Sequence, residues 1–197
     1  LTSRRLFVLL GFFVAFSGMI PVDASTSLMD EKRRVARVQA TYLTHLIKFT
    51  NWEQPDLPGK SESAKIIMLG EDKNGFVESF RFLASQSNMK IDGRDLEIIH
   101  LKQKLNSEAK LKLSQKPQVI FFLAESNFIV SDIKKLSPKS LMIGNGRDFV
   151  VEFDGDISFT NSKNRIRLII NKKTFSRNSP KLSSSISTLR NVVEIVR

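Results

Sequence analysis

Three short runs of apolar residues constrain the fold of this chain more than any other feature of its sequence. They are KIIMLG at residues 65–70, VIFFL at residues 119–123 and SLMIG at residues 140–144. Short apolar runs bounded by turn residues are typical of β-strands that are covered on both faces. A fourth strand is predicted at residues 96–101, after the turn at Asp92-Gly93.

Segments with helical spacing separate these strands. Apolar residues at three- and four-residue steps predict a helix over residues 76–84, and further helices are predicted over residues 107–113 and 128–136. Strands that alternate with helices favour a mostly parallel sheet with helices on both faces. We therefore predict an α/β fold with three layers.

The two ends of the domain depart from this alternation. Apolar residues from Val35 to Phe49 predict an amphipathic first helix, preceded by possible capping hydroxyls at residues 25–27. Residues 157–159 and 165–170 are predicted to form an antiparallel hairpin at one edge of the sheet. The C-terminal segment carries an apolar stripe that predicts a last helix, which either packs on the core or contacts a partner: Leu182, Ile186, Leu189, Val193 and Val196.

The N-terminal segment has the layout of a secretory signal peptide. Arg4 and Arg5 precede an apolar run at residues 6–20, and Val22 and Ala24 form a small-residue cleavage site. The competing interpretation is a membrane span, but the run is shorter than the roughly 20 residues that a spanning helix needs. We therefore expect a signal peptide at residues 1–24 and one periplasmic domain at residues 25–197, with no membrane insertion after cleavage.

The composition restricts the classes of partner. The formal net charge is +11, which would attract nucleic acid, anionic lipid head groups or an acidic protein. An exported protein is not expected to meet nucleic acid, so nucleic-acid binding is disfavoured. The scattered lysines favour a solvated basic surface. The chain has no cysteine, so an exported form has no disulfide and no lipid anchor on cysteine.

No group of residues in the sequence matches a known catalytic or metal-binding pattern. His45 and His100 are isolated from each other and from other metal ligands. No serine lies in a Gly-x-Ser-x-Gly turn. Three acidic pairs fall in predicted turns, where aspartate favours local hydrogen bonding: Glu71 with Asp72, Asp92 with Asp95, and Asp154 with Asp156. We expect no enzyme activity, no metal and no cofactor.

Two glycine-containing loops resemble phosphate-binding loops, and neither meets the full requirement. The loop at residues 70–75 has Phe76 and Val77 where a Walker loop needs lysine and serine or threonine. The loop at Gly144-Asn145-Gly146 has Phe149 where a dinucleotide-binding loop needs a third glycine, and no helix pattern follows it.

Several segments, in the same order along the chain, resemble the YfiR family of small bacterial periplasmic proteins. These segments are VQATYLTHLIKFTNWEQ, IIMLGEDKNGF, IDGRDLEI, QVIFFLAES, IGNGRDF, GDISF, RIRLIIN and KLSSSISTLRNVVEI, and together they extend over residues 35–196. The family commonly has cysteines, one of which leads the central strand, whereas this chain has none. Residues 116–118, which precede that strand here, are Lys-Pro-Gln.

The resemblance implies a regulator that is not an enzyme. Such proteins bind the periplasmic sensor domain of a membrane-bound diguanylate cyclase and repress it, which lowers cyclic-di-GMP and biofilm formation. We expect this chain to act in the same way, as a homodimer. Two alternatives stay open: a small-ligand sensor that uses the crevice where the Glu71 and Asn145 loops meet, and an unrecognised hydrolase.

Four residues are candidate contacts with the partner protein. Tyr42 and Trp52 are aromatic anchors, although Trp52 alternatively packs the first helix against the sheet. Arg147 and Phe149 lie on the glycine loop and are expected to face the partner. Asn171 and Ser183 match family motifs, and a backbone-capping role is the alternative for both.

Overall fold

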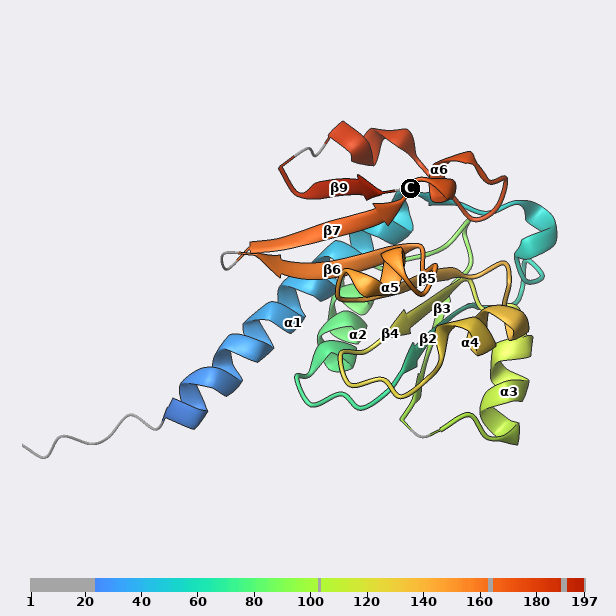
Figure 1. Cartoon of the computed structure of the whole chain (residues 1–197). Coiled ribbons are helices and arrows are strands. Elements are labelled where there is room, and N and C mark those ends of the chain that lie inside the picture. The colour runs from blue at the N-terminus through green and yellow to red at the C-terminus, as the bar shows by residue number, and fades with distance from the viewer. Residues whose placement is uncertain (1–23, 103, 163–164, 189–190, 197) are drawn as a thin grey trace, which may run out of the picture.

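The computed structural model describes residues 24–102, 104–162, 165–188 and 191–196 as one layered α/β domain (Figure 1). The predicted signal peptide lies outside the described residues except for Ala24, at which the first helix begins. None of the helices within the described ranges is long and apolar enough to span a bilayer.

A seven-stranded mixed sheet forms the middle layer, with the strand order β3-β2-β4-β5-β6-β7-β9. Its strands are β2 (Ala64–Leu69), β3 (Leu96–Leu101), β4 (Val119–Phe122), β5 (Leu141–Asn145), β6 (Ile157–Ser162), β7 (Arg165–Asn171) and β9 (Val193–Val196). The first five strands along the sheet are parallel, β7 is antiparallel to β6, and β9 is parallel to β7. The predicted mostly parallel sheet with an antiparallel hairpin is confirmed.

Helices cover both faces of the sheet, as the apolar runs predicted. On one face lie α1 (Ala24–Lys48) and α2 (Phe76–Gln86). On the other lie α3 (Ser107–Ser114), α4 (Val130–Leu136) and the short α5 (Asp148–Val151). Alternate residues of β2 divide between two hydrophobic clusters, with Ile66 and Met68 under α1 and α2 and with Ile67 and Leu69 under the opposite helices. Strands buried in this way have no polar face.

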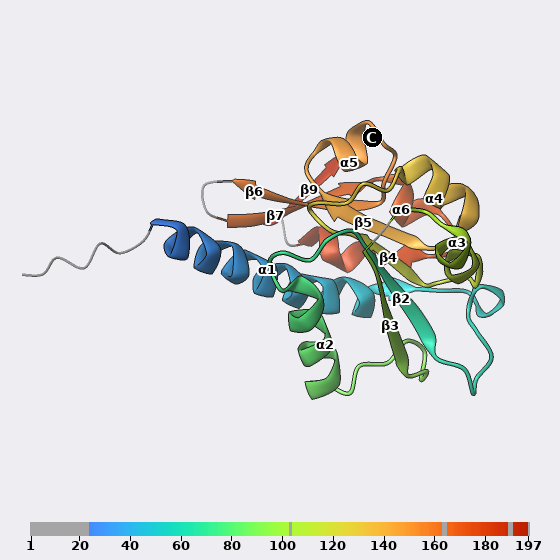
Figure 2. The same cartoon turned by 90° about the horizontal axis from the view of Figure 1, so that it is seen from below.

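The first half of α1 projects beyond the rest of the domain. Both views show it extending past the sheet at the same end as the end of β6 and the start of β7 (Figures 1 and 2). The second half packs on the core through Ala40, Leu43 and Leu46, which are fully buried.

The predicted C-terminal helix is wrong. Residues 181–196 form β8 (Lys181–Leu182), the 3-10 helix η2 (Ser184–Thr188) and the edge strand β9. β8 pairs with β1 (Thr50–Asn51), and β9 extends the sheet beyond the hairpin. The β-branched residues of VVEIV suit a pleated strand, and their spacing also happens to fit one face of a helix. Leu189 of the predicted stripe lies outside the described residues.

The glycine loop after β5 makes room for a buried ring. Phe149 on α5 lies against Gly144 of β5 and Gly155, which precedes β6, and its ring also packs on Phe122 at a centroid distance of 5.2 Å. A methyl group on either glycine would overlap the ring. Sequence patterns did not predict α5, because four residues are too few to show a helical period.

We predict that Gly144→Ala destabilises the domain by about 1–3 kcal/mol, because the added methyl group overlaps the Phe149 ring in a packed interior. Urea unfolding followed by circular dichroism measures this change. The control is Gly59→Ala, whose added methyl group meets only the flexible Glu62 side chain, at 3.5 Å. A Phe149→Leu change in the Gly144→Ala background should recover part of the loss. Equal stability of Gly144→Ala and the original chain would contradict the packing role.

Candidate functional site

The connections of the sheet create a crevice between β2 and β4. The chain leaves β2 through α2 toward β3, and it returns through α3 on the opposite face to form β4 on the other side of β2. The loops that follow β2 and β4 therefore diverge to opposite faces. In open α/β sheets, ligands bind at such a switch point, outside the carboxyl ends of the strands.

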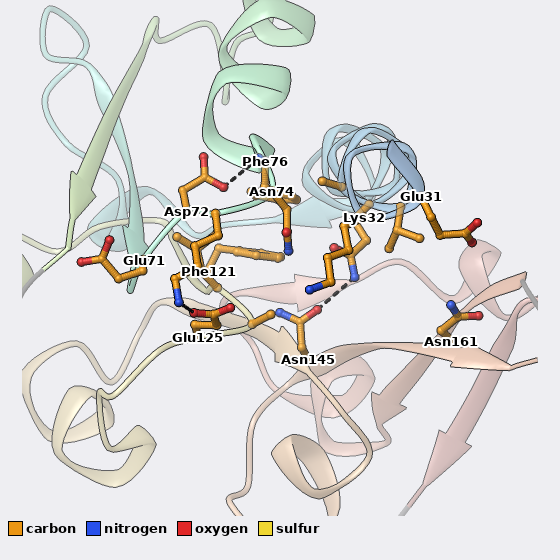
Figure 3. A pocket seen from close by; sticks show the side chains of 16 residues that line it. Glu31, Lys32, Glu71, Asp72, Asn74, Phe76, Phe121, Glu125, Asn145 and Asn161 are labelled. Carbon is orange, nitrogen blue, oxygen red and sulfur yellow. Dashed lines mark hydrogen bonds and ion pairs between the residues drawn. The ribbon is translucent and has the colours of Figure 1, made fainter. Parts of the chain in front are cut away.

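A cavity of about 240 Å³ lies at this place (Figure 3). It is bounded by the loops after β2, β4 and β5 and by the part of α1 that leaves the body. The Glu71 loop and Asn145 thus meet, as the sequence analysis expected. The lining residues are Glu31, Lys32, Val35, Ala36, Gln39, Glu71, Asp72, Lys73, Asn74, Phe76, Phe121, Leu123, Ala124, Glu125, Asn145 and Asn161.

The apolar part of the cavity is formed by two stacked aromatic rings. Phe76 at the start of α2 stacks on Phe121 of β4 with a centroid distance of 4.2 Å and an interplanar angle of 11°. The Asp72 carboxylate accepts the backbone N–H groups of Phe76 and Val77 at 2.8 and 2.9 Å, which holds the first turn of α2 in place. Both phenylalanines are buried, and their packed rings supply the apolar lining of the crevice.

Charged and amide groups surround this apolar part. Lys73 pairs with Glu125 across the loops, and the hydrogen bond and charge of Glu125, with a smaller contribution from Glu71, raise the pKa of Lys73. Asn145 ties β5 to its neighbours, since its Oδ1 accepts from Gln39 at 3.0 Å and its Nδ2 donates to the Phe122 carbonyl at 2.9 Å. Such a site suits a small molecule that has both a polar and an apolar part.

The structure describes no group of three or more histidine, cysteine or carboxylate side chains that could hold a metal ion. His45 is exposed on α1, whereas the His100 Nε2 atom lies 2.8 Å from the Gly70 carbonyl oxygen at the end of β2. The second contact fixes the loop that follows β2 and belongs to the architecture of the crevice.

The sequence-predicted partner contacts are dispersed over the domain. Tyr42 is half-buried on α1, and its ring lies 6.4 Å from that of Phe159. Trp52 is half-buried after β1, packs on the same cluster, and has a buried Nε1 atom without a hydrogen-bond partner among the described residues. Both rings thus contribute to packing. They do not lie on the cavity at the switch point.

The two candidates on the glycine loop have different environments. Arg147 is exposed, and its guanidinium pairs with Glu194 of β9 at 2.8 Å. Phe149 is only 6% exposed, between Gly144 and Gly155. The Phe149 ring is therefore a core side chain, which corrects the expectation that it faces a partner. The position of Phe149 in a predicted loop did not reveal whether its side chain is exposed, because α5 turns the ring toward the core.

An apolar groove between α1 and α2 was not predicted from the sequence. Its cavity measures about 450 Å³, and it is lined by Arg37, Thr41, Glu78, Ser79, Phe82 and Leu83. Phe82 is 63% exposed and Val38 on α1 is also exposed. The sequence does contain a signal for the exposure of Phe82. Phe82 falls outside the apolar helical stripe, and so on the side of α2 that faces solvent; the stripe consists of Phe76, Val77, Phe80 and Leu83.

The acidic pairs and the motif residues have structural roles. The Asp156 carboxylate accepts from the Met142 backbone and from Arg177, each at 2.8 Å. Asn171 contacts Asp154 and accepts from the Lys173 backbone at 3.1 Å, while the backbone N–H of Ser183 donates to the Phe49 carbonyl at 2.8 Å. Local hydrogen bonding was the interpretation favoured for the acidic pairs, and the contacts agree with it.

Comparison with protein-family models matches residues 36–189 to a family described as YfiR/HmsC-like. The matched range includes most of the 197 residues, so the resemblance seen in the sequence motifs is confirmed. It begins where α1 reaches the body of the domain and leaves residues 24–35 outside. A search of curated proteins found no match.

We predict that Asp154→Asn lowers stability slightly at neutral pH, and that this loss becomes smaller as the pH falls toward 3. Burial by itself raises the pKa of Asp154, but hydrogen bonds from Lys134 at 2.5 Å and Lys173 at 3.3 Å outweigh it and hold the pKa below the ordinary 3.8. A lowered pKa in the folded state contributes stability above the unfolded-state pKa, and this contribution is lost as the pH falls through the folded-state value.

Solvent screens this half-exposed group, so the expected loss is below about 1 kcal/mol at pH 7. Asparagine also tolerates the positive φ of 55° at this position. The measurement is urea unfolding of both chains between pH 3 and pH 7, with Asp30→Asn as a control at an exposed carboxylate. A difference that is as large at pH 3 as at pH 7 would contradict the ionic origin.

Proposed function

Because this chain belongs to the YfiR/HmsC-like family, we propose that it is a periplasmic regulator that binds the extracytoplasmic domain of an inner-membrane diguanylate cyclase and represses it. The family match over residues 36–189 is the observation that carries this proposal. The family points to regulation rather than catalysis. Repression would lower cyclic-di-GMP in the cell and reduce biofilm formation.

The mechanism is a difference in affinity for two states of the receptor. A regulator that binds the inactive cyclase more tightly than the active one shifts the population toward the inactive state. Complete reversal of a 1:99 equilibrium needs about a 10⁴-fold difference in affinity. A smaller difference produces graded repression, which is sufficient for a regulator.

We place the receptor contact on the groove between α1 and α2. Phe82 offers the largest exposed aromatic side chain of this face, and buried aromatic anchors contribute most of the energy of typical interfaces. Leu83 supplies further apolar surface beside it, and Arg37 and Glu78 supply a polar rim. Tyr42, Trp52 and Arg147 lie outside this groove.

Deletion of the gene is expected to raise cyclic-di-GMP, because the cyclase then loses its repressor. Extraction and quantification of cyclic-di-GMP from deleted and complemented strains measures the effect. The same level of cyclic-di-GMP in both strains would contradict the proposed function.

Complementation with Phe82→Ser is expected to leave cyclic-di-GMP high. Loss of an aromatic anchor costs about 2 kcal/mol, or roughly 30-fold in affinity. Phe153→Ser is the matched control, because Phe153 is also a largely exposed phenylalanine and lies beyond α5, outside the groove. Light scattering of both variants shows whether Phe82→Ser instead dissociates the proposed homodimer. Full complementation by Phe82→Ser would show that the receptor binds elsewhere.

A second function is favoured by the cavity at the switch point: sensing of a small ligand that modulates the membrane receptor. The volume of about 240 Å³ lies just below the roughly 300–1,000 Å³ of typical small-molecule sites, which limits the ligand to a small metabolite. The stacked Phe76 and Phe121 rings would hold its apolar part, and Lys32, Lys73 and the amides would hold its polar part.

Native mass spectrometry of the protein purified from its own cells tests this function. We expect a small molecule to remain bound to the original chain and to be absent from Ala124→Trp, which fills the exposed side of the cavity. Ala124 is itself exposed, so the larger side chain does not disturb the core. A ligand-free mass for the original chain, or retention of the ligand by Ala124→Trp, would contradict a ligand site here.

A further inference from the structure

The projecting half of α1 lies at the same end of the domain as the last residues of β6 and the first residues of β7, and we call this the basic end. Two views at right angles place these two segments at the same end of the molecule (Figures 1 and 2). Its charged side chains are exposed: Lys32, Arg33, Arg34 and Arg37 with Asp30 and Glu31 on α1, and Arg165 and Arg167 on β7.

Most of the positive charge at the basic end has no internal partner. Within the described ranges, one ion pair occurs there, between Arg34 and Glu31 at 3.2 Å. Lys32, Arg33 and the two β7 arginines take part in no ion pair among the described residues. Exposed cations without partners attract an anionic surface, and neighbouring cations add to this attraction.

The same end carries exposed apolar side chains ahead of the charges. Leu28 is 56% exposed and Met29 is 41% exposed, in the first turns of α1. Leu28 precedes Arg33 by about 7.5 Å along the helix axis. Leu28 is the fifth residue of α1, so the two apolar side chains lie near the projecting end of the helix, with cations one to two turns behind them. This order matches the depth profile of a lipid interface, where apolar groups enter about 5–10 Å and cations remain at the head groups.

We propose that the basic end binds the anionic lipid surface of the membrane, by electrostatic attraction with shallow burial of Leu28 and Met29. An acidic protein segment would satisfy the arginines but would not require the apolar tip. The position in the sequence agrees, since α1 begins directly after the apolar run at residues 6–20, which places this end next to the bilayer until the predicted cleavage.

This contact orients the domain toward a membrane receptor and is separate from the Phe82 groove. It also lies partly outside the range matched to the family, which begins at residue 36. The contact therefore does not depend on the identity of the receptor or on repression of a cyclase. A failure of one proposal leaves the other standing.

Vesicle flotation tests the proposal on the exported protein recovered from the periplasm, with its N-terminus established by mass spectrometry. We expect binding to vesicles of phosphatidylglycerol and phosphatidylethanolamine in 0.1 M salt, and little binding to neutral phosphatidylcholine vesicles. Each basic residue near an anionic surface contributes about 1 kcal/mol, or roughly fivefold. The double variant Arg33→Glu with Arg165→Glu should therefore bind at least about 20-fold more weakly.

The matched control is Lys104→Glu with Lys110→Glu, which makes the same change of charge just before α3 and on α3, the helix at the opposite end of the domain. This control should bind almost as the original chain does. Leu28→Ser with Met29→Ser should remove the binding that survives in 0.5 M salt, where charge attraction is screened.

Three results would overturn the proposal. The first is equal binding to anionic and neutral vesicles, and the second is an equal loss in the α3 control, which would indicate attraction by net charge alone. The third is that the protein binds no vesicles but captures the isolated periplasmic domain of the cyclase, and that Arg33→Glu abolishes this capture. Such a result would make the basic end a protein interface. Circular dichroism of every variant separates loss of binding from loss of folding.

Discussion

Strands β2, β4 and β5 are buried on both faces, and the other elements are arranged so that they cover these two faces. Each strand sends alternate residues to opposite clusters, so helices must cover both sides of the sheet. A side chain such as Ile66 or Ile67 contributes roughly 1.5–3 kcal/mol only when its own face is covered. Crossovers on two faces in turn require a place where the direction of winding changes, and the crevice between β2 and β4 is that place.

The loop after β5 illustrates how the same residues can suggest a binding motif and serve packing. Gly144 and Gly155 stand on either side of Phe149 in the chain, and both lie against its ring because the pairing of β5 with β6 brings the two segments together. Glycine is needed at Gly144 and Gly155 because any side chain there would overlap the Phe149 ring. Backbone freedom is required instead at Gly146, where φ is +82° and nothing lies near an added methyl group.

Three surfaces on three parts of the domain divide the proposed roles. The groove beside Phe82 provides an apolar anchor for a protein partner, and the crevice at the switch point encloses a small site with an apolar and a polar part. The basic end offers unpaired cations with exposed apolar residues ahead of them. Lys32 and Glu31 border both the crevice and the basic end. A ligand in the crevice and a membrane at the basic end would therefore act on the same turn of α1.

The sequence by itself determined the sheet strands, the main helices and the family, because apolar runs and helical stripes record which face of each segment is buried. It could not determine the end of the chain, since VVEIV fits a strand and a helical stripe equally well and pairing with β7 decides between them. The helical spacing placed Phe82 outside the apolar stripe of its helix, but the sequence could not show that Phe149 is buried, because four residues are too few to show a period. Burial depends on what the rest of the chain places against a side chain: two glycines and Phe122 enclose Phe149, whereas solvent borders Phe82. Only the tertiary structure contains that information.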